Sequence, residues 1–188
     1  MSQSEIYVIF GKRGSGKSNL TKRFLEELGG RVIYISMIDD LQVCDLELYT
    51  FEDIDKIADM REGQIAVCKN YSYEMFSYLC SAMIVNKNYT FAIDEVNAFS
   101  NHDSLEKLID YSRHHEINLI ANTRRYTDCP RKLTSEGKIY IFKTTEPRDK
   151  EYIYQTIGSR DVDIESLQEF QYYDVDLKEK KFSSLSQL

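Results

Sequence analysis

The chain contains few of the residues that usually separate domains. Two prolines and eight glycines occur among the 188 residues, and they do not cluster into a linker. The sequence has no internal repeat and no low-complexity tract. This length gives room for a sizeable core. We therefore expect one domain over residues 1–188, with its core at about residues 5–158 and a C-terminal extension at about residues 159–188.

Long hydrophobic runs are also missing. No apolar run approaches the roughly 18 residues of a membrane-spanning helix. Residues 1–5 are polar and lack the character of a signal peptide. Hydrophobic residues make up 42% of the chain and charged residues 29%, as in ordinary globular proteins. These features predict a cytoplasmic protein without a membrane span.

Patterns typical of metal centres and disulfide frameworks are absent as well. None of the cysteines forms a C-x-x-C pair, so we expect reduced, mostly buried thiols at Cys44, Cys68, Cys80 and Cys129. The histidines lack ligand partners at a metal-binding spacing: His102, His114 and His115. Neither set indicates a zinc centre.

Positive charge is in deficit. With 24 Lys and Arg against 31 Asp and Glu, the formal net charge is −7. This balance argues against a protein that coats nucleic acid with its whole surface. It leaves open a local basic loop or the pore of an oligomer.

One strong motif is present near the N-terminus. Residues 11–18 read Gly-Lys-Arg-Gly-Ser-Gly-Lys-Ser and fit G-x-x-x-x-G-K-[ST], the P-loop. An apolar, β-rich run precedes the motif at residues 6–9, and residues 19–28 follow it with helical spacing of apolar residues. A strand, a glycine loop and a helix together form the context in which this motif binds phosphate.

The chemistry of such a loop assigns roles to its residues. Successive backbone N–H groups point at phosphate oxygens, and the helix N-terminus adds a partial positive charge. We expect Lys17 to reach the β- and γ-phosphates of ATP and Ser18 to ligate Mg²⁺. The expected nucleotide contacts are Gly11, Lys12, Arg13, Gly14, Ser15, Gly16, Lys17, Ser18 and Asn19.

A second motif follows an apolar strand at residues 89–93. The strand ends in Asp94 and Glu95, a pattern seen in Walker B segments. Asp94 would hold Mg²⁺ beside the P-loop, and Glu95 would orient and deprotonate the attacking water. The second acidic residue favours hydrolases of the additional-strand P-loop class over small-molecule kinases and GTPases.

The remaining pattern alternates between strands and helices. Apolar runs predict strands at residues 31–36, 64–68, 117–121 and 138–142. Helical spacing predicts helices at residues 51–61, with Ile54, Ile57 and Ala58 inward, and at residues 73–85, 103–115 and 147–157. Residues 37–48 are polar and ambiguous, residues 166–170 suggest a helical turn, and residues 172–177 and 181–184 suggest a hairpin. Asp103 or Ser104 is the expected N-cap of its helix.

This alternation predicts an α/β fold. We expect a three-layer P-loop NTPase of the additional-strand, RecA-like class, with a mainly parallel sheet, helices on both faces and a C-terminal β-hairpin. The strand at residues 117–121 ends at Asn122 and Thr123, where a polar side chain can touch the γ-phosphate or the attacking water. A plain turn at the end of the strand is the alternative.

The segment at residues 111–125 carries a more specific resemblance. Arg113-His114, a short turn, an apolar strand and Thr123-Arg124-Arg125 resemble the FtsK/HerA superfamily of P-loop ATPases, as do Pro130 and the strand after it. The resemblance runs from about residue 6 to residue 157. The small size is similar to that of the viral genome-packaging members.

The resemblance implies a homo-oligomeric ring, commonly a hexamer, with ATP at subunit interfaces and double-stranded DNA in the pore. A neighbour's arginine would complete each site, and the candidates are Arg113, Arg124 and Arg125. Arg124 stands where glutamine is frequent in the family, so the sensor role stays open between Asn122 and Thr123. In the host cytoplasm, a capsid or portal protein would be a further partner.

Segments with cations or polar side chains are the candidates for DNA contact. They are Arg131-Lys132, the lysines Lys178, Lys180 and Lys181, and the polar loop at residues 97–103. The first functional hypothesis is an ATP-driven DNA translocase that packages a viral genome. The alternatives are a nucleotide kinase or other small-molecule phosphotransferase, and a regulatory ATPase switch that does not pump DNA.

Overall fold

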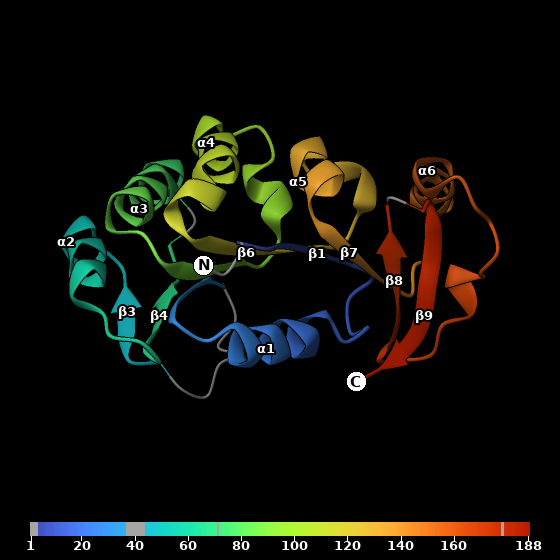
Figure 1. The fold of residues 1–188 in the computed structure, drawn as a ribbon, viewed down its shortest axis with the longest axis horizontal. Helices are drawn as coiled ribbons and strands as arrows, with labels where there is room; N and C mark the ends of the chain where they lie inside the picture. The colour runs from blue at the N-terminus through green and yellow to red at the C-terminus, as the bar shows by residue number, and fades with distance from the viewer. Residues whose placement is uncertain (1–3, 37–43, 71, 178) are drawn as a thin grey trace.

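The structure is a computed structural model that describes residues 4–36, 44–70, 72–177 and 179–188 (Figure 1). A nine-stranded sheet runs through it in the order β3-β4-β2-β5-β6-β1-β7-β8-β9. The strands are β1 Ile6–Phe10, β2 Arg31–Ile35, β3 Leu46–Leu48, β4 Ile65–Cys68, β5 Tyr89–Ile93, β6 Ile117–Thr123, β7 Lys138–Phe142, β8 Gln171–Asp176 and β9 Lys181–Gln187. Strands β1 to β7 are parallel, so their carboxyl ends share one edge of the sheet.

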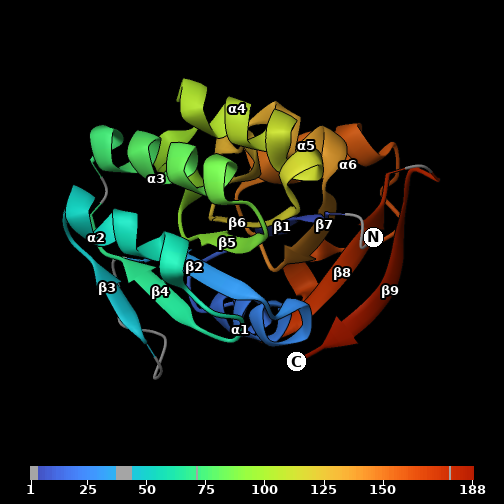
Figure 2. The same ribbon diagram turned by 60° about the vertical axis from the view of Figure 1, so that its left-hand side comes forward.

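Helices cover both faces unequally. Helix α1, Lys17–Leu28, lies on one face, and the other helices lie on the opposite face (Figures 1 and 2). Those helices are α2 Phe51–Asp55, α3 Tyr73–Asn86, α4 Asp103–Ser112, α5 Arg131–Glu136 and α6 Pro147–Ile157. The three-layer, mainly parallel α/β fold predicted from the sequence is confirmed.

Each face of the sheet has its own apolar core. Side chains of successive strand residues alternate between faces, so Ile9 packs with Leu20 and Phe24 of α1. Its neighbours Val8 and Phe10 pack into the larger core beneath the other helices. The inward face of α4 follows the helical period, since Leu105, Leu108, Ile109 and Ser112 are all buried.

The position of β6 decides the class of P-loop fold. Strand β6 pairs with β1 on one side and with β5 on the other. The strand that carries the P-loop is therefore separated by one strand from the strand that ends in Asp94 and Glu95. This is the additional-strand arrangement that the sequence predicted.

The C-terminal hairpin is also present. Strand β8 pairs antiparallel with β7, and β9 pairs antiparallel with β8. The helical turn expected at residues 166–170 is wrong, because the short 3₁₀ helix there covers Ile164–Ser166 and Phe170 adopts a left-handed φ of 64°. A left-handed residue cannot continue a right-handed turn.

Other differences from the sequence-based expectations are local. The helix expected at residues 51–61 splits into α2 and a 3₁₀ helix, Lys56–Asp59, whose tighter turn exposes Ala58 and buries Met60. Within the ambiguous segment, Leu46–Leu48 forms an edge strand, while residues 37–43 lie outside the described residues.

The cap of α4 differs as well. His102, and not Asp103 or Ser104, is the N-cap, because its Nδ1 accepts a hydrogen bond from the Ser104 N–H at 3.2 Å. Cys68, Cys80 and Cys129 are buried free thiols as expected, whereas Cys44 is exposed. Among the described residues, no helix is long and apolar enough to cross a membrane.

Candidate nucleotide-binding site

The P-loop spans the gap between β1 and α1 at the carboxyl edge of the sheet. Gly14 and Gly16 adopt φ values of 75° and 112°, which side chains with a Cβ rarely tolerate. The Gly11 N–H donates to the Thr123 carbonyl of β6 at 3.3 Å, and the Lys12 N–H donates to the Lys143 carbonyl after β7 at 3.0 Å. These two hydrogen bonds hold the loop against β6 and the end of β7, the two strands that flank β1.

Lys17 lies inside the loop. Its Nζ donates to the carbonyl of Gly11 at 2.8 Å and to that of Lys12 at 3.1 Å, and the residue is 8% exposed. Burial lowers the pKa of the ammonium, while the nearby carboxylates of Glu95 and Asp94 raise it. Lys17 and the two carboxylates therefore lie within electrostatic range of one another.

One buried hydroxyl in the loop has no protein partner. The Oγ of Ser15 makes no hydrogen bond to any of the described residues, although Ser15 is only 2% exposed. A buried polar atom without a partner is uncommon and costly. Together with the loop N–H groups, an unsatisfied hydroxyl suits an oxygen-rich anion such as phosphate.

The two carboxylates follow β5 at the same edge of the sheet. The Asp94 N–H donates to the Ile35 carbonyl at 2.9 Å, which continues the ladder to β2. Glu95 adopts a left-handed conformation with φ 56° and ψ 57°, and its Oε1 forms an ion pair with Nε of Arg124. Both acidic residues are half-buried.

Ser18 and Asp94 are the residues available for a magnesium ion. Ser18 is half-buried in the first turn of α1, and Asp94 ends the neighbouring strand β5. No group of three or more His, Cys, Asp or Glu side chains suited to a metal occurs among the described residues. The pair of oxygen donors from Ser18 and Asp94 fits Mg²⁺, because this ion takes few protein ligands and completes its shell with phosphate and water.

The residues at the end of β6 point to opposite faces. Asn122 is buried on the α1 side, where its Nδ2 donates to Thr21 Oγ1 at 2.9 Å. The Thr123 hydroxyl donates to the Arg125 carbonyl at 3.1 Å. Both candidate sensor side chains thus have partners within the protein, and Thr123 reaches the P-loop through its backbone carbonyl.

The three candidate arginines lie in different surroundings. Arg124 contacts Glu95, and Arg125 lies 3.7 Å from the buried carboxylate of Asp149. Arg113 is elsewhere, in the 3₁₀ helix Arg113–His115 that leads into β6 at the amino edge of the sheet. The structure therefore brings Arg124 to Glu95 and places Arg113 at the opposite edge of the sheet.

Sequence reasoning missed several residues at this site. They include Thr21, Phe142, Lys143, Phe170 and Leu188. Thr21 lies one helical turn after Lys17, so its place on α1 was available from the motif. Nothing in the local pattern around Phe170 or Leu188 indicates a contact with a loop so distant in the chain.

Comparison with known proteins adds the context of the fold. No protein-family model and no curated protein matches the sequence. Among solved structures, the genome-packaging NTPase B204 of Sulfolobus turreted icosahedral virus 2, in complex with AMPPCP, superposes with a TM-score of 0.77 at 18% identity, over 97% of both chains. The DNA-packaging ATPase B204 of Sulfolobus Turreted Icosahedral Virus gives 0.75 at 19% identity, again over 97% of both chains.

A bacterial secretion ATPase shares the fold at a lower score. ATPases 2 and 3 of Thermomonospora curvata EccC, in complex with a signal sequence peptide, match with a TM-score of 0.63 at 14% identity, over 98% of this chain and 36% of that one. At these identities the likeness concerns the fold. At the level of the fold, the resemblance to viral genome-packaging NTPases that the sequence predicted is confirmed, and the EccC ATPases share the same fold.

Proposed function

We propose that the protein is an ATP-hydrolysing DNA translocase that packages a viral genome. The observation that carries the proposal is the convergence of Lys17, Asp94 and Glu95 at one edge of the sheet, with β6 between their strands. The likeness to B204, described as a DNA-packaging ATPase, extends over nearly the whole of both chains and supports the choice among P-loop ATPases.

ATP is the proposed substrate, and residues 11–19 are its proposed contacts. The unsatisfied Ser15 hydroxyl and the buried Lys17 ammonium suit phosphate groups. B204 has been solved with AMPPCP and with ATP-gammaS. Ser18 and Asp94 would hold Mg²⁺, which neutralises phosphate charge when bound.

Glu95 is the proposed general base. Its carboxylate accepts from Arg124 and so is oriented at the junction of β5 and β6. A carboxylate there can take a proton from a water that attacks the terminal phosphate. Arg124 then acts within the subunit, by positioning Glu95.

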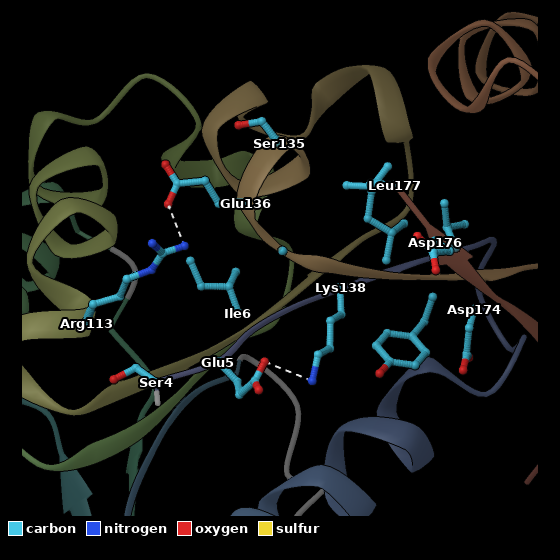
Figure 3. A pocket seen from close by; sticks show the side chains of 14 residues that line it. Ser4, Glu5, Ile6, Arg113, Ser135, Glu136, Lys138, Asp174, Asp176 and Leu177 are labelled. Atoms are coloured by element: carbon cyan, nitrogen blue, oxygen red, sulfur yellow. Dashed lines mark ion pairs between the residues drawn. The ribbon is translucent and has the colours of Figure 1, made fainter. Parts of the chain in front are cut away.

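Arg113 is the best placed of the three arginines to act on a neighbouring subunit. Its side chain is 60% exposed, and its contact with Glu136 is long, at 3.9 Å. It lines a cavity of about 560 Å³ at the amino edge of the sheet, together with Glu5, Lys138 and Asp176 (Figure 3). The proposed assembly is a homo-oligomeric ring, with six subunits as the expected number. In such a ring this surface would face the P-loop of the next subunit.

A groove at the carboxyl edge is the proposed contact for double-stranded DNA. It has a volume of about 640 Å³ and is lined by Asn97, Asn101, Arg131 and Lys132, which come from both segments that the sequence nominated. One wall of the groove comes from the segment that follows Glu95 in the chain, and the other comes from the segment that follows Arg125. A ligand in the groove would therefore lie close to the Glu95–Arg124 ion pair.

The deciding experiment is steady-state ATP hydrolysis against protein concentration, with and without double-stranded DNA. We expect the rate per subunit to rise with concentration and again with DNA. Glu95→Gln should bind ATP and lose about a hundredfold or more in turnover. Normal hydrolysis by this variant would show that Glu95 is not the base.

Two other results would replace the proposal. Phosphate transfer to a nucleoside in the absence of DNA would identify a phosphotransferase. Tight nucleotide binding with negligible turnover, unchanged by DNA, would identify a regulatory switch.

A further inference from the structure

The arrangement of the site gives a bound nucleotide a direction. Asp94 and Glu95 lie on the β5 side of the P-loop, while β7 and β8 lie on its other side. A triphosphate with its terminal phosphate beside Lys17 and the carboxylates would therefore leave the loop toward β7 and β8. The nucleoside would lie at that end.

Two apolar side chains border the loop there. A Cβ atom built on Gly16 would lie 2.9 Å from Cδ1 of Phe170 and 3.3 Å from Cδ1 of Leu188. Both side chains therefore touch the backbone of the phosphate loop. Phe170 directly precedes β8 and Leu188 directly follows β9, so the open end of the hairpin supplies both.

Backbone hydrogen bonds hold these two residues in place. The Phe170 N–H donates to the Ser15 carbonyl at 3.0 Å, and the Leu188 N–H donates to the Phe170 carbonyl at 3.1 Å. Phe170 keeps a left-handed φ of 64°, which is rare for a bulky residue, and strained residues of this kind cluster at active sites, ligand clamps and switch regions. Phe170 is half-buried and Leu188 is 37% exposed, so both keep apolar surface for a ligand.

A separate observation indicates that the adjoining stretch of the loop binds a ligand. Ser15, whose carbonyl accepts from Phe170, is the residue whose buried hydroxyl has no partner among the described residues. Ser15 thus carries the unpaired hydroxyl and is also hydrogen-bonded through its carbonyl to Phe170. The polar and the apolar parts of the expected nucleotide site are therefore adjacent.

We propose that Phe170 and Leu188 form the wall on which the nucleoside of the bound nucleotide packs. This inference rests on the proposed function and assigns its base-contacting residues. The wall contacts Gly16 through side-chain carbon atoms, which do not distinguish the hydrogen-bonding edges of the bases. Adenine and guanine nucleotides should therefore bind with similar affinity.

The test compares two probes that share the phosphate chain and differ in the nucleoside. Mg²⁺-ATP and Mg²⁺-tripolyphosphate are titrated into the full chain and its variants. Phe170→Ala should bind ATP about tenfold more weakly, as expected for a lost base–aromatic contact, and tripolyphosphate within twofold of the unaltered protein. Phe170→Tyr, which keeps the ring, should bind both normally.

The same hairpin offers a matched control. Leu185 is 51% exposed and pairs with Tyr173, which packs on the face of the sheet opposite to Phe142 and Tyr172. Leu185→Ala should leave the affinity for both probes unchanged.

The outcomes separate this inference from the proposed function. Equal losses of ATP and tripolyphosphate binding in Phe170→Ala would mean that Phe170 only supports the shape of the loop. Unchanged binding of both would mean that the ring does not touch the nucleotide. If the unaltered protein bound neither probe, the proposed function itself would fail.

Discussion

The side-chain amide of Asn122 donates a hydrogen bond to the hydroxyl of Thr21, 2.9 Å away, and both groups are buried. The Thr21 hydroxyl in turn lies 3.1 Å from the carbonyl of Lys17. The contact ties β6 to the first turns of the helix that carries the phosphate-binding lysine. Asn122 therefore acts on the site through the position of α1.

Loss of both partners of this pair should cost less than the two single losses added together. Asn122→Ala leaves the Thr21 hydroxyl buried with one partner fewer, and we expect a loss of about 1–3 kcal/mol in the free energy of unfolding. The double variant with Thr21→Val should lose less than the two single losses added together. Urea denaturation of the four proteins measures the coupling.

Ser81→Ala is the matched control for this cycle. The Ser81 hydroxyl is exposed and donates within its own helix, to the Ser77 carbonyl at 2.9 Å. Its removal should change the free energy of unfolding by less than about 0.5 kcal/mol. Strictly additive losses at Asn122 and Thr21 would show that the hydrogen bond does not couple the two elements.

The sequence was sufficient for features in which neighbours along the chain determine the structure. The spacing of Gly11, Gly16 and Lys17 defines the phosphate loop because these residues lie at the junction of one strand and the helix that follows it. The buried face of α4 followed from the 3.6-residue period alone. The carboxylates after β5 were expected near the P-loop because parallel strands bring their carboxyl ends to one edge.

Features that depend on tertiary packing were not accessible in this way. Phe170 meets Gly16 because β8 turns back antiparallel to β7, a pairing that no local spacing records. His102 caps α4 because its ring is held between Phe76 and Tyr73 of α3. Asn122 and Thr123 were alternative candidates for a contact with the phosphate, and the side of β6 on which each side chain lies decides its partners within the protein.

Removal of the charge of Lys17 should abolish nucleotide binding and leave the stability of the nucleotide-free protein nearly unchanged. Burial lowers the pKa of Lys17, so the unfolded chain holds this proton more tightly than the folded one does. The charged form therefore opposes folding at neutral pH, and this penalty fades as the pH rises through the lowered folded pKa toward 10.5. Lys17→Met removes both the penalty and the hydrogen bonds to Gly11 and Lys12.

We therefore expect Lys17→Met to unfold within about 2 °C of the unaltered protein when no nucleotide is present. Mg²⁺-ATP should raise the melting temperature of the unaltered protein and leave that of Lys17→Met unchanged. Lys22→Met, further along α1, should keep the full ATP-induced shift. A Lys17→Met variant that is still stabilised by ATP would contradict the assignment of Lys17.

Arg124 should affect turnover through Glu95 and have little effect on ATP binding. Loss of the ion pair lets the Glu95 carboxylate move, and a small misplacement of a catalytic group costs about tenfold to a hundredfold in rate. We expect Arg124→Ala to lower kcat by this factor with the affinity for ATP within threefold. In a Glu95→Gln background the same substitution should cause no further loss.

Arg160→Ala provides the control for Arg124. Arg160 is also an exposed arginine paired with a glutamate, and its partner Glu151 lies on helix α6, away from the P-loop. Its removal should leave kcat unchanged. An additive loss from Arg124→Ala in the Glu95→Gln background would mean that Arg124 acts on the substrate independently of Glu95.

Arg113 should act on a neighbouring subunit, and mixing of two inactive variants tests this directly. Arg113→Ala should lose about a thousandfold in ATP turnover, the range of an arginine that acts in trans, because a neighbour no longer receives its charge. Glu95→Gln should be inactive for a different reason, since its own base is missing. In a mixed assembly, an Arg113→Ala subunit keeps Glu95 and can receive Arg113 from a Glu95→Gln neighbour.

Activity should therefore reappear when the two proteins are mixed, and it should peak near equal proportions. Mixing of Arg113→Ala with Lys17→Met should restore activity in the same way, because the Lys17→Met subunit still supplies Arg113. A mixture of Glu95→Gln and Lys17→Met should stay inactive, since neither subunit has a complete set of its own catalytic groups. If Arg113 acted within its own subunit, all three mixtures would remain as inactive as their components, and the amino-edge cavity would lose its proposed role in assembly.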